Sequence, residues 1–273
     1  MSESTYIHGT SAEEQRRLSL MNDVLLNPFS LRELALRGDE RVIDFGSGLG
    51  QFSRAMARAV PRGSVVGIER DDVQRAGARR LAEEAGEGNL VEWRAGDVLA
   101  LDLGDEWGTY DVAHTRFVLE HVPDPLRVVQ TMLRAVRPGG RVVLADDDHE
   151  LLRLWPEPPG WSDVWRAYIR TYDRIGNDPI VGRRLVELLH AAGAQPKRNA
   201  YIFFGGCAGM DYFDVLTANM LGVVTGAREA ILSMKLFDAS LFDVVVREYK
   251  SWAKRPDAAI WFAMSWAEGV RAN

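Results

Sequence analysis

The segment Val42-Ile-Asp-Phe-Gly-Ser-Gly-Leu-Gly50 places three alternating glycines directly between a short apolar run and a helical pattern. Glycine adopts backbone conformations that a tight turn needs, and its missing side chain lets backbone approach a ligand closely. The amides that open the following helix suit a polar or anionic group. In open α/β sheets, such turns lie at the carboxyl ends of strands, where ligands bind. The loop therefore predicts a ligand-binding α/β sheet.

The rest of the chain supports a doubly wound arrangement. Short apolar runs begin near residues 41, 64, 90, 110 and 141, and most of them are separated by helical stretches at 51–59, 72–85 and 125–136. Strands that alternate with helices indicate βαβ units with right-handed crossovers and helices on both faces. Two further strands are expected at 199–204 and 259–266. We predict an α/β, Rossmann-like, mainly parallel seven-stranded sheet with N-terminal helices and a helical insertion before the last strand.

The same pattern predicts the domain organisation. Residues 1–38 are expected to form an N-terminal helical cap, since apolar residues recur at helical spacing from residue 10 onward. Residues 39–205 are expected to form the ligand-binding core, with a lid at 147–180. Residues 206–273 are expected to supply a helical insertion, mainly 210–254, and the final strand of the core.

Composition restricts the kinds of partner that the protein is expected to bind. The chain has 273 residues and a net charge of −6 with scattered basic residues, which argues against a nucleic acid or an acidic membrane as partner. Its single cysteine, Cys207, excludes an intrachain disulfide and a cysteine-rich zinc site. The polar start, Met1–Gln15, and the absence of a long apolar run favour a cytoplasmic protein. We expect a small-molecule partner and a monomer or homodimer.

Two acids follow the glycine loop at the ends of the next two strands. Glu69 ends the second strand, where a carboxylate accepts hydrogen bonds from ribose hydroxyls. Asp97 follows the third strand, where it suits an exocyclic adenine amine, while the Val98 amide suits a ring nitrogen. These turns would converge on one adenosine. The alternative is that the glycines only make tight turns and the acids are solvated.

The spacing of the glycines separates two nucleotide-type ligands. A dinucleotide fingerprint reads G-x-G-x-x-G or ends in alanine. Here the glycines alternate, and the sixth position is Gln51. This departure disfavours the pyrophosphate of a dinucleotide.

The motifs at 44–50, 69 and 95–98, together with Leu119-Glu-His-Val-Pro-Asp-Pro125 and Arg137-Pro-Gly-Gly-Arg-Val142, resemble those of class I S-adenosylmethionine-dependent methyltransferases. The subgroup resembled is the small-molecule set that includes the ubiquinone and menaquinone methyltransferases. The resemblance implies that Asp44 orients the loop and the cofactor ammonium, that Glu69 binds ribose and that Asp97 binds adenine. It also implies a seventh, antiparallel strand.

The expected cofactor is S-adenosylmethionine. The Tyr6-Ile-His8-Gly9 segment resembles one that folds over the cofactor in some relatives, although a disordered tail is the alternative. The expected cofactor-binding residues are Tyr6, Asp44, Gly46, Ser47, Gly48, Gly50, Glu69, Arg70, Asp97, Val98, His114 and Thr115.

Methyl transfer from a sulfonium needs a general base only when the acceptor arrives protonated, because positioning supplies much of the rate. His114 is expected to end the fourth strand and to face the acceptor. The other candidates are His121, for which a structural role is the favoured explanation, and a carboxylate–histidine pair formed by Asp148 and His149.

The Asp146–His149 run contains ligand types that metals use. Adjacent residues of an extended chain point to opposite sides, so at most two of the four are expected to share an ion. We therefore predict no metal and expect activity to survive a chelator.

Several aromatic residues follow that run. Trp155, Trp161, Trp165, Tyr168 and Tyr172 suit the wall of a pocket for a flat or apolar acceptor, or simply the packing of a lid. The sequence thus predicts a methyltransferase that acts on a small, aromatic or apolar molecule of cofactor or specialised metabolism. The alternatives are a nucleotide-dependent oxidoreductase on a similar fold and a cofactor-binding scaffold without turnover.

Overall fold

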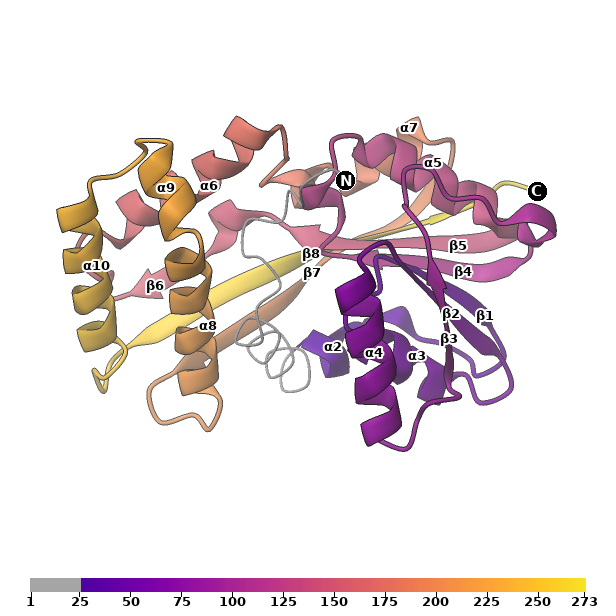
Figure 1. Ribbon diagram of the computed structural model, residues 1–273, viewed down its shortest axis with the longest axis horizontal. Coiled ribbons are helices and arrows are strands. Elements are labelled where there is room, and N and C mark those ends of the chain that lie inside the picture. Colours follow the sequence, from indigo (N-terminus) through magenta and orange to yellow (C-terminus); the bar gives the residue numbers. More distant parts are fainter. Residues whose placement is uncertain (1–25) are drawn as a thin grey trace.

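The computed structural model describes residues 26–273. The expected Tyr6 contact and the helix that begins near residue 10 lie outside these residues. Within them, a single twisted sheet carries helices on both faces and continues at one end into a helical half (Figure 1).

The sheet has the strand order β3-β2-β1-β4-β5-β8-β6, with β7 paired to the other edge of β8. Strands β1 to β5 are parallel, and β8 is antiparallel to β5, β6 and β7. The bounds are β1 Arg41–Phe45, β2 Ser64–Glu69, β3 Val91–Ala95, β4 Tyr110–Arg116, β5 Val136–Asp147, β6 Arg153–Trp155, β7 Gln195–Cys207 and β8 Ala259–Val270. The predicted doubly wound, mainly parallel sheet is confirmed, and the short β6 is an addition to the seven expected strands.

Alternation along the central strands builds two apolar layers. Val42 packs in the layer that contains helices α2 (Asn27–Leu34) and α3 (Gln51–Ala59). Its neighbour Ile43 packs in the opposite layer, with helices α5 (Pro125–Ala135) and α7 (Leu185–Ala191). Helix α4 (Asp72–Glu84) connects β2 to β3. Because both faces are covered, the strands read as nearly continuous apolar runs.

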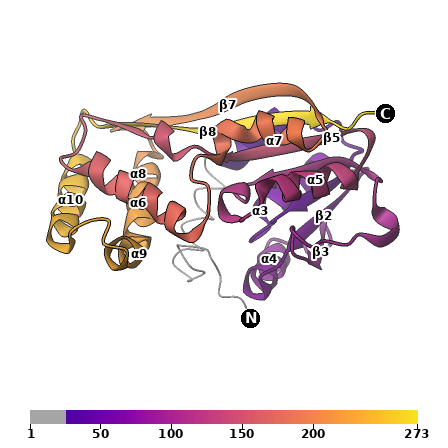
Figure 2. The same cartoon turned by 90° about the horizontal axis from the view of Figure 1, so that it is seen from above.

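The lid and the insertion form one helical half. Helix α6 (Trp161–Ile175) contacts α8 (Phe213–Gly226), α9 (Arg228–Ser233) and α10 (Ala239–Trp252). Figures 1 and 2 show these four helices together at the end of the molecule opposite α5 and β1, with the long strands β7 and β8 running into them.

The predicted helical stretch at 210–254 consists of three helices. Helix α8 ends at Gly226, and α9 ends before Lys235, whose φ is +56°. Helix α10 then begins after Asp238, whose carboxylate accepts from the Ser240 and Leu241 amides. None of the helices in residues 26–273 is both long and apolar enough to cross a bilayer.

Candidate cofactor and acceptor site

The glycine loop joins β1 to α3 in a conformation that only glycine adopts easily. Gly46, Gly48 and Gly50 have φ values of +76°, +54° and +74°. A Cβ on Gly46 would lie 2.4 Å from Val118, and one on Gly50 would lie 2.1 Å from Trp93. Both backbone freedom and close packing therefore require these glycines.

Hydrogen bonds tie the loop to the end of β2. The Gly46 and Ser47 amides both donate to the Ile68 carbonyl at 2.9 Å. The Gly48 amide donates to Glu69 Oε2, and the Asp71 amide donates to Glu69 Oε1, each at 2.9 Å. Burial raises the pKa of the Glu69 carboxyl although these two amides oppose the shift. Glu69 thus supports the loop as well as lying where the ribose is expected.

Asp44 is held on both sides of its carboxylate. Its Oδ2 accepts from Ser53 Oγ at 2.5 Å, and its Oδ1 lies 2.8 Å from His114 Nδ1. The residue is buried. This arrangement fixes the first residue of the loop, in keeping with the orienting role proposed for it.

His114 lies inside the core rather than at the end of its strand. Strand β4 continues to Arg116, and His114 is completely buried with its ring 4.9 Å from Phe52 of α3 and 6.4 Å from Trp266 of β8. The prediction that it ends the strand and faces the cleft is wrong, because its side chain lies on the sheet face that α3 covers. It contacts Asp44 instead.

The other expected cofactor residues differ in exposure. Asp97 is exposed, and its Oδ1 accepts from the Leu99 amide; Val98 is buried. Arg70 is exposed. Thr115 is completely buried and donates to the Phe45 carbonyl at 2.9 Å, so the structure places it between strands rather than on the loop surface.

Sequence reasoning missed Arg116, the last residue of β4. Its guanidinium donates to Ser30 Oγ and Asn27 Oδ1 of α2 and lies 4.3 Å from the centre of the Phe52 ring. Burial lowers its pKa to about 10, and Asp44 opposes the shift. Its place near the end of the fourth predicted strand was visible in the sequence, but its burial was not.

A second group of polar side chains lies at the ends of β4 and β5. We call Glu120, His121, Asp146, Asp147 and His149 the polar cluster. Asp146 Oδ2 accepts from the Val118 and Leu119 amides at 3.1 and 2.8 Å, which fastens the turn after β4 to β5. The cluster therefore bridges two adjacent strand ends.

The expected pair of Asp148 and His149 does not form. Asp148 points to Arg183, which makes two 2.7 Å hydrogen bonds to its carboxylate. His149 Nε2 instead lies 2.8 Å from Glu120 Oε2, a residue that sequence reasoning quoted in a motif without assigning it a role. The carboxylate–histidine pair exists, but its carboxylate comes from the neighbouring strand end.

Burial and mutual repulsion set the protonation of the polar cluster. Burial raises the pKa values of Asp146 and Asp147 well above the ordinary range, and the nearby Glu120 carboxylate adds to this. Burial alone would lower the pKa of His149, yet attraction to Glu120 raises it. Burial lowers the pKa of His121. The pKa shifts of His149 and His121 thus have opposite directions, because only His149 is hydrogen-bonded to Glu120 at close range.

Helix α6 supplies an aromatic wall to this cluster. Tyr168 and Tyr172 each lie 5.3 Å from the His149 ring, and Trp165 Nε1 donates to the His149 carbonyl at 2.7 Å. Trp161 packs against Tyr249 of α10 at 4.2 Å, and Trp155 is 67% exposed. Three of the five expected aromatic residues therefore contact His149 of the cluster.

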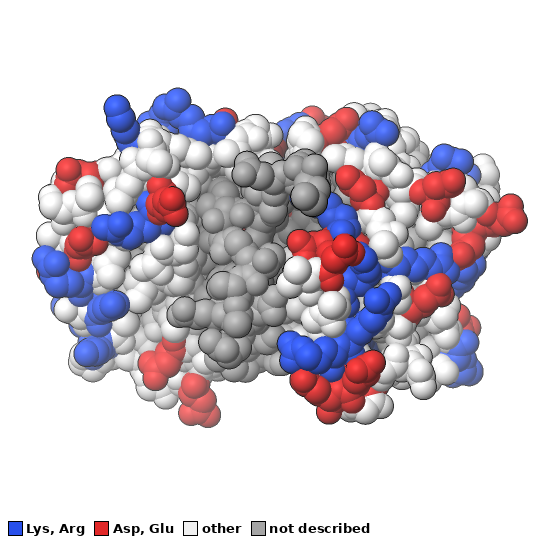
Figure 3. Space-filling view, in the orientation of Figure 1, with Lys and Arg blue, Asp and Glu red and all other residues white. Residues whose placement is uncertain are grey.

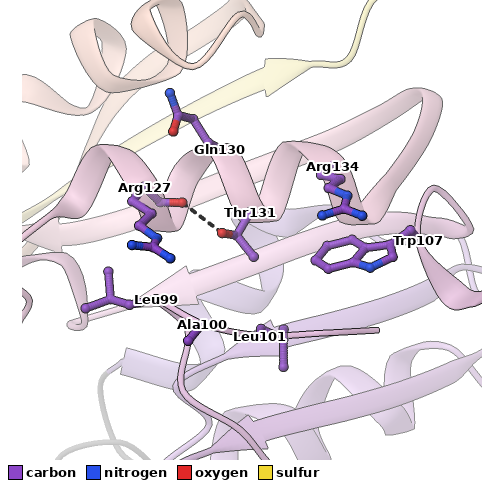
Figure 4. Close-up of a pocket in the computed structure, with 8 residues that line it drawn as sticks. All are labelled: Leu99, Ala100, Leu101, Trp107, Arg127, Gln130, Thr131 and Arg134. Carbon is purple, nitrogen blue, oxygen red and sulfur yellow. Dashed lines mark hydrogen bonds between the residues drawn. The ribbon is translucent and has the colours of Figure 1, made fainter. Parts of the chain in front are cut away.

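A separate surface pocket of about 450 Å³ lies between α5 and the segment that follows Asp97 and Val98 (Figure 4). Arg134 stacks 4.0 Å above the Trp107 ring, and Arg127 also lines the pocket. None of the cofactor or catalytic residues expected from the sequence lines it.

On the face of the molecule shown in Figure 3, acidic and basic side chains occur together on both halves.

Comparisons with known proteins agree with this architecture. A family model described as a methyltransferase domain matches residues 13–197. The chain is 36% identical over 166 residues to an uncharacterized 37.1 kDa protein in transposon TN4556 of Streptomyces fradiae, covering 60% of this chain and 46% of that protein. It is 37% identical over 125 residues to the ubiquinone biosynthesis O-methyltransferase of Pseudomonas aeruginosa, covering 44% and 51%. The chain spans about half the length of these relatives.

Among solved structures, geranyl diphosphate methyltransferase in complex with SAM shares the fold, with a TM-score of 0.53 and 16% identity over 97% of this chain and 92% of that one. The family model covers more than half of the chain. The chain therefore belongs to the methyltransferase domain family.

Proposed function

We propose that this enzyme transfers the methyl group of S-adenosylmethionine to a small molecule with an aromatic or apolar body, held beside the polar cluster and beneath helix α6. The observation that carries the proposal is the order of sites along the sheet. Asp44 of β1 is in register with His114 of β4, and Arg116 of β4 with Ala145 of β5. The glycine loop and the polar cluster therefore occupy consecutive strand ends, where open α/β sheets bind ligands.

The cofactor pose follows from the groups with remaining hydrogen-bond capacity. Each Glu69 oxygen accepts one amide, and a carboxylate oxygen can accept a second donor. The ribose hydroxyls are suitable donors. Asp97 accepts one amide through a single oxygen, which leaves the other for the adenine amine. The methionine end then points along the glycine loop toward β4.

The chemistry requires little beyond alignment. The acceptor atom attacks the methyl carbon, the carbon–sulfur bond breaks, and its electron pair remains on sulfur as a neutral thioether. An acceptor O–H or N–H group also loses its proton. Of the four expected catalytic residues, His121 and His149 lie in the polar cluster, whereas His114 and Asp148 are engaged elsewhere. We assign the acceptor side to His121 and to the Glu120–His149 pair.

The relatives inform the acceptor class. A ubiquinone biosynthesis O-methyltransferase is among the proteins that the chain resembles, and ubiquinone is a ring compound. Tyr168, Tyr172 and Trp165 pack around His149, so a ring held beside His149 would lie next to aromatic side chains. We therefore propose phenols and hydroquinols as the first acceptors to examine.

The experiment combines direct binding with product formation. The full chain is titrated calorimetrically with S-adenosylmethionine and then incubated with the methyl-labelled cofactor and a panel of phenols and hydroquinols. Gly46→Ala should abolish cofactor binding, because the added Cβ meets Val118 at a positive φ. Gly86→Ala is the matched control, since its φ is +71° and no atom lies within 4 Å of the added Cβ.

Labelled product that forms with the parent and with Gly86→Ala, but not with Gly46→Ala, would support the proposal. Tight cofactor binding with no transfer to any small molecule would favour the scaffold alternative instead.

A further inference from the structure

We propose that Glu120, Asp147 and His149 bind one divalent metal ion on the acceptor side of the methyl-transfer centre. Each residue offers one ligand atom, and these three atoms all lie within 4.8 Å of one another. Two ligands that bind one ion at about 2.0–2.4 Å are separated by about 5 Å at most. The three side chains therefore already meet the distance requirement for a shared ion.

The backbone explains why the run from 146 to 149 contributes two ligands. Asp148 is extended, with φ −116° and ψ 95°, so its neighbours Asp147 and His149 share one side of the chain. Asp148 occupies the opposite side and binds Arg183. The sequence-based limit of two ligands from this run is respected. The prediction of no metal did not count Glu120, which the adjacent strand end supplies.

The positions of these ligands are fixed before any ion binds. The Asp146 carboxylate accepts two amides of the turn that carries Glu120, and this holds the turn against β5. His149 packs between Trp165, Tyr168 and Tyr172. Such support from outside the ligand set is typical of functional metal sites.

Unsatisfied polar atoms mark the same place. Asp147 Oδ1 and His149 Nδ1 are both buried, and neither has a hydrogen-bond partner. His149 is only 5% exposed. Within residues 26–273, no lysine or arginine forms an ion pair with Asp147; the nearby Arg183 binds Asp148 and Glu150. A buried carboxylate without a cation or donors is costly, and a divalent ion removes that cost.

The donor set indicates the kind of ion. Two carboxylates with one imidazole suit Mn²⁺, Fe²⁺ or Zn²⁺, whereas Ca²⁺ prefers a site built entirely of oxygen atoms. Three protein ligands leave coordination positions open. If the proposed methyl transfer holds, an acceptor oxygen would occupy one of them. Its proton would pass to water, after which the oxygen attacks the methyl carbon as the carbon–sulfur bond breaks. This role of the ion in methyl transfer rests on the proposed function. The binding of the ion itself does not depend on that function.

The test measures ion binding directly. The full chain is stripped with EDTA, dialysed and titrated with Mn²⁺ while the free ion is followed by electron paramagnetic resonance. We expect one Mn²⁺ per chain. Glu120→Gln, Asp147→Asn and His149→Ala should each weaken binding at least about tenfold. Asp173→Asn and His190→Ala are the matched controls, because both side chains are exposed, and they should bind as the parent does.

Titration with S-adenosylmethionine checks that each variant is folded and keeps this result separate from the proposed function. Retained cofactor binding with specific loss of Mn²⁺ binding would support the site. The proposal is overturned if the parent binds none of Mn²⁺, Fe²⁺, Zn²⁺ or Mg²⁺, or if Asp147→Asn binds Mn²⁺ as tightly as Asp173→Asn. Binding of a cationic amine at the cluster without any divalent ion would also overturn it.

Discussion

Glu69 combines support of the glycine loop with a raised carboxyl pKa, and this makes cofactor binding sensitive to pH. Ribose hydroxyls donate to the ionised carboxylate, so binding favours the deprotonated form. Because burial raises the pKa above its ordinary value of 4.5, the cofactor affinity should fall as the pH drops, beginning above that value. The same titration of Glu69→Gln should show a weaker affinity that no longer varies over this pH range. A parent protein whose affinity is constant down to pH 4.5 would remove Glu69 from the ribose site.

His114 should act on cofactor binding through Asp44 rather than on the chemical step. His114→Gln disturbs the contact to Asp44 Oδ1 and should weaken cofactor binding by about 1–3 kcal/mol, the cost of an unsatisfied buried acceptor. The single-turnover rate at saturating cofactor should remain within a few-fold of the parent. A fall in that rate of about 10²–10⁴ with unchanged affinity would restore the role of general base.

These residues show which parts of the site a sequence can predict. The glycine loop and Glu69 depend on local spacing, and the structure places them as expected. The orientation of His114 depended on the register of β4, and a shift of one residue changes which face of the sheet a side chain meets. Glu120 and His149 are 29 residues apart and meet only because β4 and β5 are neighbours in the sheet. No local pattern carries that information.

At the scale of elements, the strands and helices of the core were predictable because each has a start or stop signal. Helix α5 begins with an Asp124 cap followed by Pro125, and its predicted bounds differ from the observed ones by one residue. The insertion was harder to divide because its apolar residues continue across the breaks. The breaks depend on positive φ at Lys235 and on the Asp238 cap, and both are weak signals in the sequence.

Tyr249 joins three helices of the helical half, which gives an element-scale prediction. It lies on α10, stacks on Trp161 of α6 at 4.2 Å, and donates to the Thr217 carbonyl of α8 at 2.9 Å. Tyr249→Ala should lower the free energy of unfolding by about 3–5 kcal/mol, as expected for a buried aromatic side chain. Denaturant unfolding measures this change. Tyr201→Ala, at a half-exposed position on β7, is the control and should change the stability far less.

At the scale of the whole molecule, the two halves share the same strands. Strand β8 pairs with β5 through Met264–Val270 and with β6 through Ala259–Trp261, and β7 accompanies it along its full length. The chain crosses between the halves along the hydrogen-bonded strands β7 and β8, and also through the short segments 148–152 and 176–180. The half that contains the glycine loop and the helical half are therefore expected to unfold together.

This continuity makes a prediction for hydrogen exchange. A ligand present at about 100 times its dissociation constant stabilises the folded state by about 2.7 kcal/mol, and it slows exchange through global unfolding about 100-fold. S-adenosylmethionine should therefore slow the slowest amides of α8 and α10 as strongly as those of β1 and β4, although the glycine loop lies in the other half (Figure 1). Mass spectrometry of peptides from each element measures both rates in one sample. Slowing confined to β1 and β4 would show that the helical half opens separately, and the shared strands would then not couple the two halves.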